Sequence, residues 1–159
     1  MKKLFFYLLA ALPLFVFNSC SDDDDLPDVD FKLDVTDGVS VDGVLYVVRG
    51  ESLVIDGITV VNNEKNKTAI ITAATYYWDA FRLGTSAVAP YGFTISTTEQ
   101  TPLGHHELAI ECPVYAVDKS PAVANLFYNV EVVADEADIP EGNTPGTTSF
   151  SIESHLLAN

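Results

Sequence analysis

The sequence predicts an all-β protein in which antiparallel sheets pack face to face as a β-sandwich. Apolar and polar residues alternate with a period of two in several segments, as in strands with one buried face. Turn pairs such as Asp37-Gly38 and Asp42-Gly43 separate these segments at regular intervals. No segment beyond the N-terminal region has the periodicity of an amphipathic helix. We therefore expect seven to eight short strands.

The first half of the predicted sandwich begins with alternating residues at 31–35 and a second strand at 44–48. A longer apolar segment then changes phase. Leu53 and Ile55 follow one alternation, whereas Ile58 and Val60 follow the other, and the change falls on residues 56–57. Either a β-bulge in one long strand or a hairpin accounts for this change, and we favour the bulge.

The central segment, residues 76–108, contains the strongest strand pattern. Tyr76 and Trp78 alternate with Tyr77 and Asp79, which predicts that Tyr76 and Trp78 face the core. A tight turn is expected at residues 79–80. Ala80 stands where a type I′ turn favours glycine, because that turn requires a positive φ. We therefore expect a different turn type or a bulge there.

The same segment resembles a motif of bacterial immunoglobulin-like domains. The matching residues are Tyr76, Trp78, Asp79, Leu83, Gly84, Thr85, Ala89, Pro90, Tyr91, Phe93, Gly104, His106 and Leu108. This resemblance implies an immunoglobulin-like antiparallel β-sandwich, with His106 in a structural position at the start of its strand. Such sandwiches have many different roles, so the resemblance implies no particular ligand.

The N-terminal residues resemble the signal of a bacterial lipoprotein. Residues 1–19 combine Lys2 and Lys3 with an apolar run that is shorter than the roughly 20 residues of a membrane-spanning helix. Cys20 follows Ser19, as in a lipobox, and is the expected lipid attachment site. The acidic run at residues 22–25 resembles the export signal of Bacteroidetes-type surface lipoproteins. An ordinary secretory leader followed by an acidic linker remains the alternative.

Composition excludes one class of partner and argues against several chemistries. The chain has 23 acidic and 8 basic side chains and a net charge of −15, so we expect no binding to nucleic acid. No nucleotide, zinc or nucleophile motif is present, and we expect no enzyme, no cofactor and no metal. His105 and His106 are adjacent, so on a strand they face opposite sides. Cys112 is expected to be buried and unreactive.

Tyr77 and Phe81 are the candidate ligand contacts, because exposed aromatic side chains can stack on a sugar ring or anchor a partner protein. Edge protection or a contact between domains would also account for them.

The predicted organisation has four parts: a leader (1–19), an acidic tether (20–28), the sandwich (29–133) and a tail (134–159). In the tail, Phe150 and Ile152 fit either a final strand or an irregular end. We expect a non-enzymatic binding or accessory module, anchored by lipid in the outer membrane and exposed on the cell surface. Its partner would be a glycan or a protein. The alternative is a structural subunit of a fimbrial or outer-membrane complex.

Overall fold

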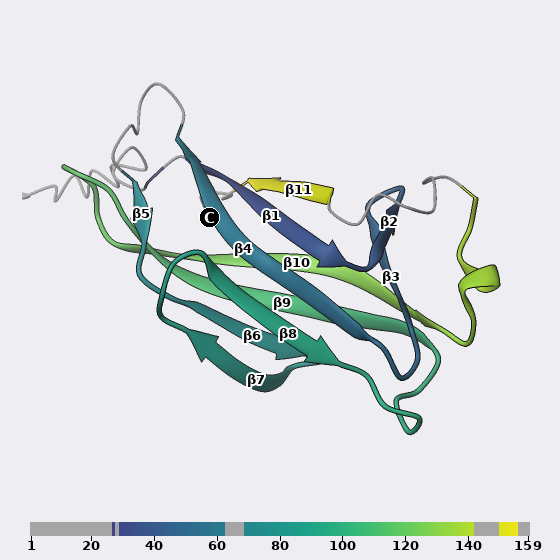
Figure 1. Ribbon diagram of the computed structural model, residues 1–159. Coiled ribbons are helices and arrows are strands. Elements are labelled where there is room, and N and C mark those ends of the chain that lie inside the picture. The colour runs from purple at the N-terminus through teal and green to yellow at the C-terminus, as the bar shows by residue number, and fades with distance from the viewer. Residues whose placement is uncertain (1–26, 28, 63–68, 142–149, 156–159) are drawn as a thin grey trace, which may run out of the picture.

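The computed structural model of the chain describes residues 27, 29–62, 69–141 and 150–155 (Figure 1). These residues form two packed β-sheets. The smaller sheet has the order β11-β1-β4-β8, and the larger sheet has the order β2-β3-β10-β9-β6-β7, with β5 paired to β9. The strands are β1 (Val29–Asp37), β2 (Val39–Val41), β3 (Val44–Val48), β4 (Ser52–Asn62), β5 (Ile70–Ile71), β6 (Ala74–Trp78), β7 (Phe81–Ser86), β8 (Tyr91–Ser96), β9 (Gly104–Tyr115), β10 (Ala122–Val133) and β11 (Phe150–His155), with a short 3₁₀ turn η2 (Glu136–Asp138).

The strand order is that of an immunoglobulin-like sandwich, which confirms the predicted fold class. In that fold, strands A, B and E belong to one sheet and strands C, F and G to the other. Here β1, β4 and β8 take the places of A, B and E, while β6, β9 and β10 take those of C, F and G. β7 joins the larger sheet as its edge strand. β3 pairs in parallel with β10, so the first part of the chain contributes to both sheets.

The number of strands in the described residues is larger than expected, for a simple reason. Eight longer strands match the prediction, and the short strands β2 and β5 and the C-terminal β11 are added to them. β11 pairs antiparallel with β1, from Val35 opposite Phe150 to Asp30 opposite His155. Residues 150–155 of the tail therefore form a final strand and not an irregular end.

The core consists of the inward-facing residues of both sheets. Tyr76 is completely buried, as predicted, and its ring stacks on Phe93 of the opposite sheet at a centroid distance of 4.6 Å. Its hydroxyl donates a hydrogen bond to the carbonyl oxygen of Tyr91 at 2.6 Å. Trp78 packs against this core, as predicted, but it is only partly buried, because it is the last residue of β6 before the turn into β7.

The predicted bulge in the long strand is present. β4 is continuous, and its register with β1 shifts so that Gly57 lies opposite Asp34 and Ile55 opposite Val35, which leaves Asp56 as the extra residue. A Cβ atom on Gly57 would lie 2.7 Å from the carbonyl oxygen of Pro90. The bulge therefore brings the backbone of β4 against the start of β8.

The expectation about the turn at residues 79–80 was wrong. Asp79 has a φ of 47° and Ala80 a φ of 68°, and both values are positive, as a type I′ turn requires. Trp78 pairs directly with Phe81, so the loop has two residues. The hydrogen bonds of Asp79 to β9, described below, hold this turn in place. A register shift does occur in the same hairpin, but between Tyr76 and Tyr77.

The predicted leader and, apart from Pro27, the predicted tether lie outside the described residues, and so do Cys20 and the acidic residues 22–25. Among the helices of the described part of the chain, none has the length and apolar character that a membrane span needs.

Candidate functional site

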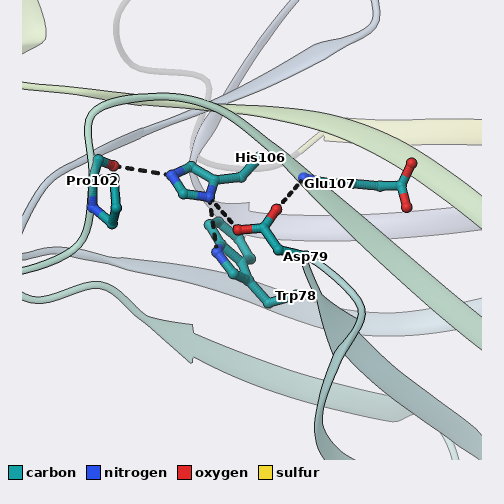
Figure 2. A network of polar contacts seen from close by, with 5 residues as sticks. All are labelled: Trp78, Asp79, Pro102, His106 and Glu107. Carbon is teal, nitrogen blue, oxygen red and sulfur yellow. Dashed lines mark hydrogen bonds and ion pairs between the residues drawn. The ribbon is translucent and has the colours of Figure 1, made fainter.

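A network of polar side chains joins the β6–β7 turn to the start of β9 (Figure 2). Asp79 accepts a hydrogen bond from the backbone N–H of Glu107 at 2.9 Å, and its own N–H donates to the carbonyl oxygen of Glu107 at 3.0 Å. The second carboxylate oxygen lies 2.6 Å from Nδ1 of His106. Nε2 of His106 lies 2.9 Å from the carbonyl oxygen of Pro102. The network therefore links the β6–β7 turn and the loop between β8 and β9 to the start of β9.

The protonation state of His106 determines which neighbour forms a hydrogen bond with its Nδ1. Nε2 donates to the carbonyl oxygen of Pro102, because a carbonyl can only accept. Nδ1 lies near both the carboxylate of Asp79 and the indole Nε1 of Trp78, the latter at 3.1 Å. It cannot donate to Asp79 and accept from Trp78 at once. The imidazolium therefore pairs with Asp79, and the neutral ring accepts from Trp78.

The surroundings favour the ion pair. Burial by itself would lower the pKa of His106, but its hydrogen bonds to Asp79 and Pro102 and the charges of Asp79 and Glu131 raise that pKa above the ordinary value. Burial would likewise raise the pKa of Asp79, but the Glu107 N–H and His106 outweigh it and hold that pKa below its usual range. Both pKa shifts mean that the charged form of the side chain is stabilised in the folded protein.

His106 is the buried centre of this network. His106 is 6% exposed and lies at the start of β9, as the resemblance implied. No buried polar side-chain atom in the described residues lacks a hydrogen-bond partner. His105 points to the other, exposed side. Within the same described ranges, no group of three potential ligands is arranged to hold a metal ion.

Cys112 lies inside the sandwich, as predicted. Its side chain is completely buried on β9, and burial raises the pKa of the thiol to about 12. A thiol that stays protonated is a poor nucleophile, so this cysteine acts as a small apolar core residue.

The two candidate ligand contacts, Tyr77 and Phe81, lie in the same hairpin but in different rows of the sheet. Tyr77 pairs with Arg82, whereas Phe81 pairs with Trp78 beside the turn. Phe81 is 78% exposed, and Tyr77 is partly exposed. Because neighbouring rows point to opposite faces of a sheet, the two rings do not form one platform.

The aromatic residue that shares a row with Tyr77 is Phe127 of β10. Tyr77 lies opposite Ala109 of β9, and Ala109 lies opposite Phe127 on its other side. Phe127 is 62% exposed. The signal that could have found Phe127 is the alternation along β10, in which Asn129 and Glu131 also face out. Only the strand register could place it in the row of Tyr77.

Other large apolar side chains are exposed on the same outer face of the larger sheet. They belong to β5, β9 and β10 and comprise Ile70, Tyr115 and Val123. The glutamates and asparagines of the same strands separate them from Phe127. The outer face of the larger sheet is therefore an exposed surface of mixed aromatic, apolar and polar character.

Comparisons with known proteins add little to this description. No family model and no curated protein sequence matches the chain. Among solved structures, the chain is similar to the fibronectin(III)-like modules of Clostridium thermocellum CbhA, with 20% sequence identity and a TM-score of 0.39. That similarity covers 64% of this chain and 94% of the other. The fold assignment rests on strand order and register and not on this similarity.

Proposed function

We propose that the protein is a non-enzymatic binding or accessory module of immunoglobulin-like fold, held on the outer surface of a cell by lipid on Cys20. The observation that carries the binding role is the outer face of the larger sheet, where Phe127 is 62% exposed on a regular strand. A sheet face of this kind without function would favour polar side chains, because exposed apolar residues invite association. The leader and the acidic run support the placement.

The anchor is tested by fractionation of cells that express the full chain. Cys20→Ala removes the acceptor thiol and should move the protein from the membrane fraction to the soluble fraction, because the acyl chains provide the membrane affinity. Cys112→Ala changes a cysteine that is buried in the sandwich and should leave the protein on the membrane. If the Cys20→Ala protein stays with the membrane, lipid at this residue is not the anchor.

Exposure on the cell surface is tested separately, by protease treatment of intact cells. The wild-type chain should be cleaved. Replacing the aspartates of residues 22–25 by asparagine should keep the protein on the membrane and protect it from the protease, if this run is the export signal. Protection of the wild-type chain would contradict the placement.

A second candidate, a structural subunit of a fimbrial or outer-membrane complex, is supported by the position of β11. This strand lies at the edge of the smaller sheet, and among the residues that the structure describes it pairs with β1 alone (Figure 1). A strand at an edge can pair with another chain instead. Truncation after Asp138 separates the two roles. Loss of assembly with unchanged stability of the monomer would favour the subunit, whereas loss of stability alone would mean that β11 completes its own sandwich.

A further inference from the structure

One row of residues on the outer face of the larger sheet, called the seat below, places a small side chain between two aromatic ones. Phe127, Ala109 and Tyr77 lie side by side on β10, β9 and β6. Because adjacent strands lie about 4.8 Å apart, the two aromatic residues stand roughly 10 Å apart across the alanine. Ala109 has a small side chain, so it leaves room between the two aromatic residues, which are called the walls of the seat.

Polar rows border this seat on both sides. Along each strand, the next outward-facing side chain lies two residues, or about 7 Å, from the seat in either direction. These side chains are polar. One row contains Asn125, Glu111 and Thr75, and the other contains Asn129 and Glu107. In the parts of the chain that the structure describes, neither glutamate forms a salt bridge. The seat is thus surrounded by amides and carboxylates that can bond to a ligand.

The charged side chains around the seat are of both signs, since two carboxylates flank the row and one guanidinium lies at its end. Glu107 and Glu111 on the central strand would repel an anion. Arg82 lies opposite Tyr77 at one end of the row, and its guanidinium donates to the hydroxyl oxygen of Thr85 at 2.8 Å, which keeps it on this side of the hairpin. A cation beside Tyr77 would meet this positive charge. A neutral ligand that offers many hydroxyl groups meets neither penalty.

The polar rows also argue against an extended apolar protein interface. The next outward residue of β10 beyond Asn125 is Val123, so the row of Asn125 and Glu111 interrupts the apolar surface between Phe127 and Val123. The interface cores of protein complexes are depleted in charged residues, whereas this face has a carboxylate on each side of the seat.

We propose that the seat binds a neutral saccharide chain. Sugar rings would stack with their C–H faces on Tyr77 and Phe127 across Ala109, and hydroxyl groups would donate to Glu107 and Glu111 and bond to the flanking asparagines. This inference rests on the proposed function as a binding module and names its ligand class. Phe127 provides the more exposed of the two walls, and it is therefore the main determinant of affinity.

The test is a binding assay with the purified, full-length chain. The probes are four soluble neutral polysaccharides (a β-glucan, a xylan, a mannan and a dextran), the anionic polysaccharide alginate, and an octa-arginine peptide. We expect binding to at least one neutral polysaccharide and little change of its Kd with salt, because no ionic contact is involved. Phe127→Ala and Tyr77→Ala should each weaken this binding at least about tenfold, as for aromatic anchors of other interfaces.

Two further variants separate the seat from its surroundings. Phe127→Trp keeps an aromatic wall and should retain binding. Val123→Ala removes an exposed apolar side chain from the same face of β10, on the far side of the Asn125 row, and should leave the Kd unchanged. Circular dichroism spectra identical to wild type would establish that all four variants are folded.

Several results would overturn the inference. These are an absence of binding to every neutral polysaccharide, a preference for alginate, and salt-sensitive binding to the octa-arginine peptide alone, which would indicate a basic protein partner. Equal weakening by Val123→Ala and Phe127→Ala would also count against the seat. Binding of a protein but of no saccharide would refute this inference and leave the proposed binding function intact.

Discussion

At the scale of single residues, the backbone of Ala80 is strained. From the sequence we expected a turn that avoids this strain. Its φ of 68° lies in the left-handed region, where a Cβ atom costs roughly 1–2 kcal/mol. The neighbouring Asp79 is held by two hydrogen bonds to Glu107, which keep the turn in this conformation. The contacts of Asp79 therefore offset the strain at Ala80.

We predict that Ala80→Gly raises the free energy of unfolding by about 1 kcal/mol, because glycine adopts a positive φ without the steric cost. Ala109→Gly is the matched control. It makes the same change within the regular strand β9 and should lower the free energy of unfolding by roughly 0.5–1 kcal/mol. Urea denaturation measures both. The same sign for the two variants would contradict the assignment of strain to Ala80.

The ion pair of His106 and Asp79 makes stability depend on pH. His106 has a raised pKa, so its contribution is complete below its unfolded value of 6.5 and is lost as the pH rises through the folded pKa. Asp79 has a lowered pKa, so its contribution is present above 3.8 and is lost as the pH falls through the folded pKa. The pair therefore stabilises the fold most between these two values.

We predict that the loss of stability caused by Asp79→Asn is largest between about pH 4 and 6.5 and becomes smaller on either side. Denaturant unfolding at a series of pH values measures this difference. The emission of Trp78, the single tryptophan of the chain, should change over the range in which Nδ1 of His106 loses its proton. His105→Gln, on the opposite face, removes only the smallest of the effects that lower the pKa of Asp79 and should change the profile much less than Asp79→Asn does. A difference that does not vary with pH would refute the ion pair.

The residues that alternation alone could place were predicted correctly, and those that depend on distant contacts were not. Tyr76 and Cys112 are buried because their strands alternate. The contacts of His106 with Trp78 and Asp79 join positions 28 and 27 residues apart. No local pattern specifies which side chains meet over that separation, and the pairing of Tyr77 with Phe127 through Ala109 depends on strand register in the same way.

At the scale of elements, the bulge in β4 fixes how closely the two neighbouring strands approach. The phase change at Asp56 was visible in the sequence, because both halves of the strand must bury their apolar residues on one side. The partner at the bulge was not visible. Gly57 lies against Pro90, and its missing side chain leaves room for the backbone N–H of Ile58 to donate to the carbonyl oxygen of Pro90 at 2.9 Å.

We predict that Gly57→Ala lowers the free energy of unfolding by about 1–3 kcal/mol, since the added Cβ would overlap the backbone of Pro90. Gly43→Ala is the comparison. Gly43 has a positive φ of 81°, but no heavy atom lies within 4 Å of the position that a Cβ atom would take there, so this variant reports backbone strain without overlap. Equilibrium unfolding in urea measures both. A smaller loss for Gly57→Ala than for Gly43→Ala would show that the contact with Pro90 relaxes easily.

At the scale of the whole molecule, two tyrosines join the sheets. Tyr76 reaches from β6 to the carbonyl oxygen of Tyr91 on β8, and the hydroxyl of Tyr91 donates back to the carbonyl oxygen of Ile71 on β5 at 2.7 Å. The stacked rings of Tyr76 and Phe93 lie beside these bonds. A predominantly apolar core permits small sliding of two sheets, and directional bonds between them restrict it.

We predict that Tyr76→Phe lowers the free energy of unfolding by about 1–2 kcal/mol, because it removes the hydroxyl and deprives the Tyr91 carbonyl oxygen of this partner while keeping the stacked ring. Tyr77→Phe is the matched control, since it removes a hydroxyl from the next residue on the outer face. It should change stability by less than about 0.5 kcal/mol. Denaturant unfolding measures both, and amide exchange of β8 should be faster in Tyr76→Phe alone, because β8 is the edge strand that this bond holds. Equal stability of the two variants would mean that apolar packing alone fixes the sheets together.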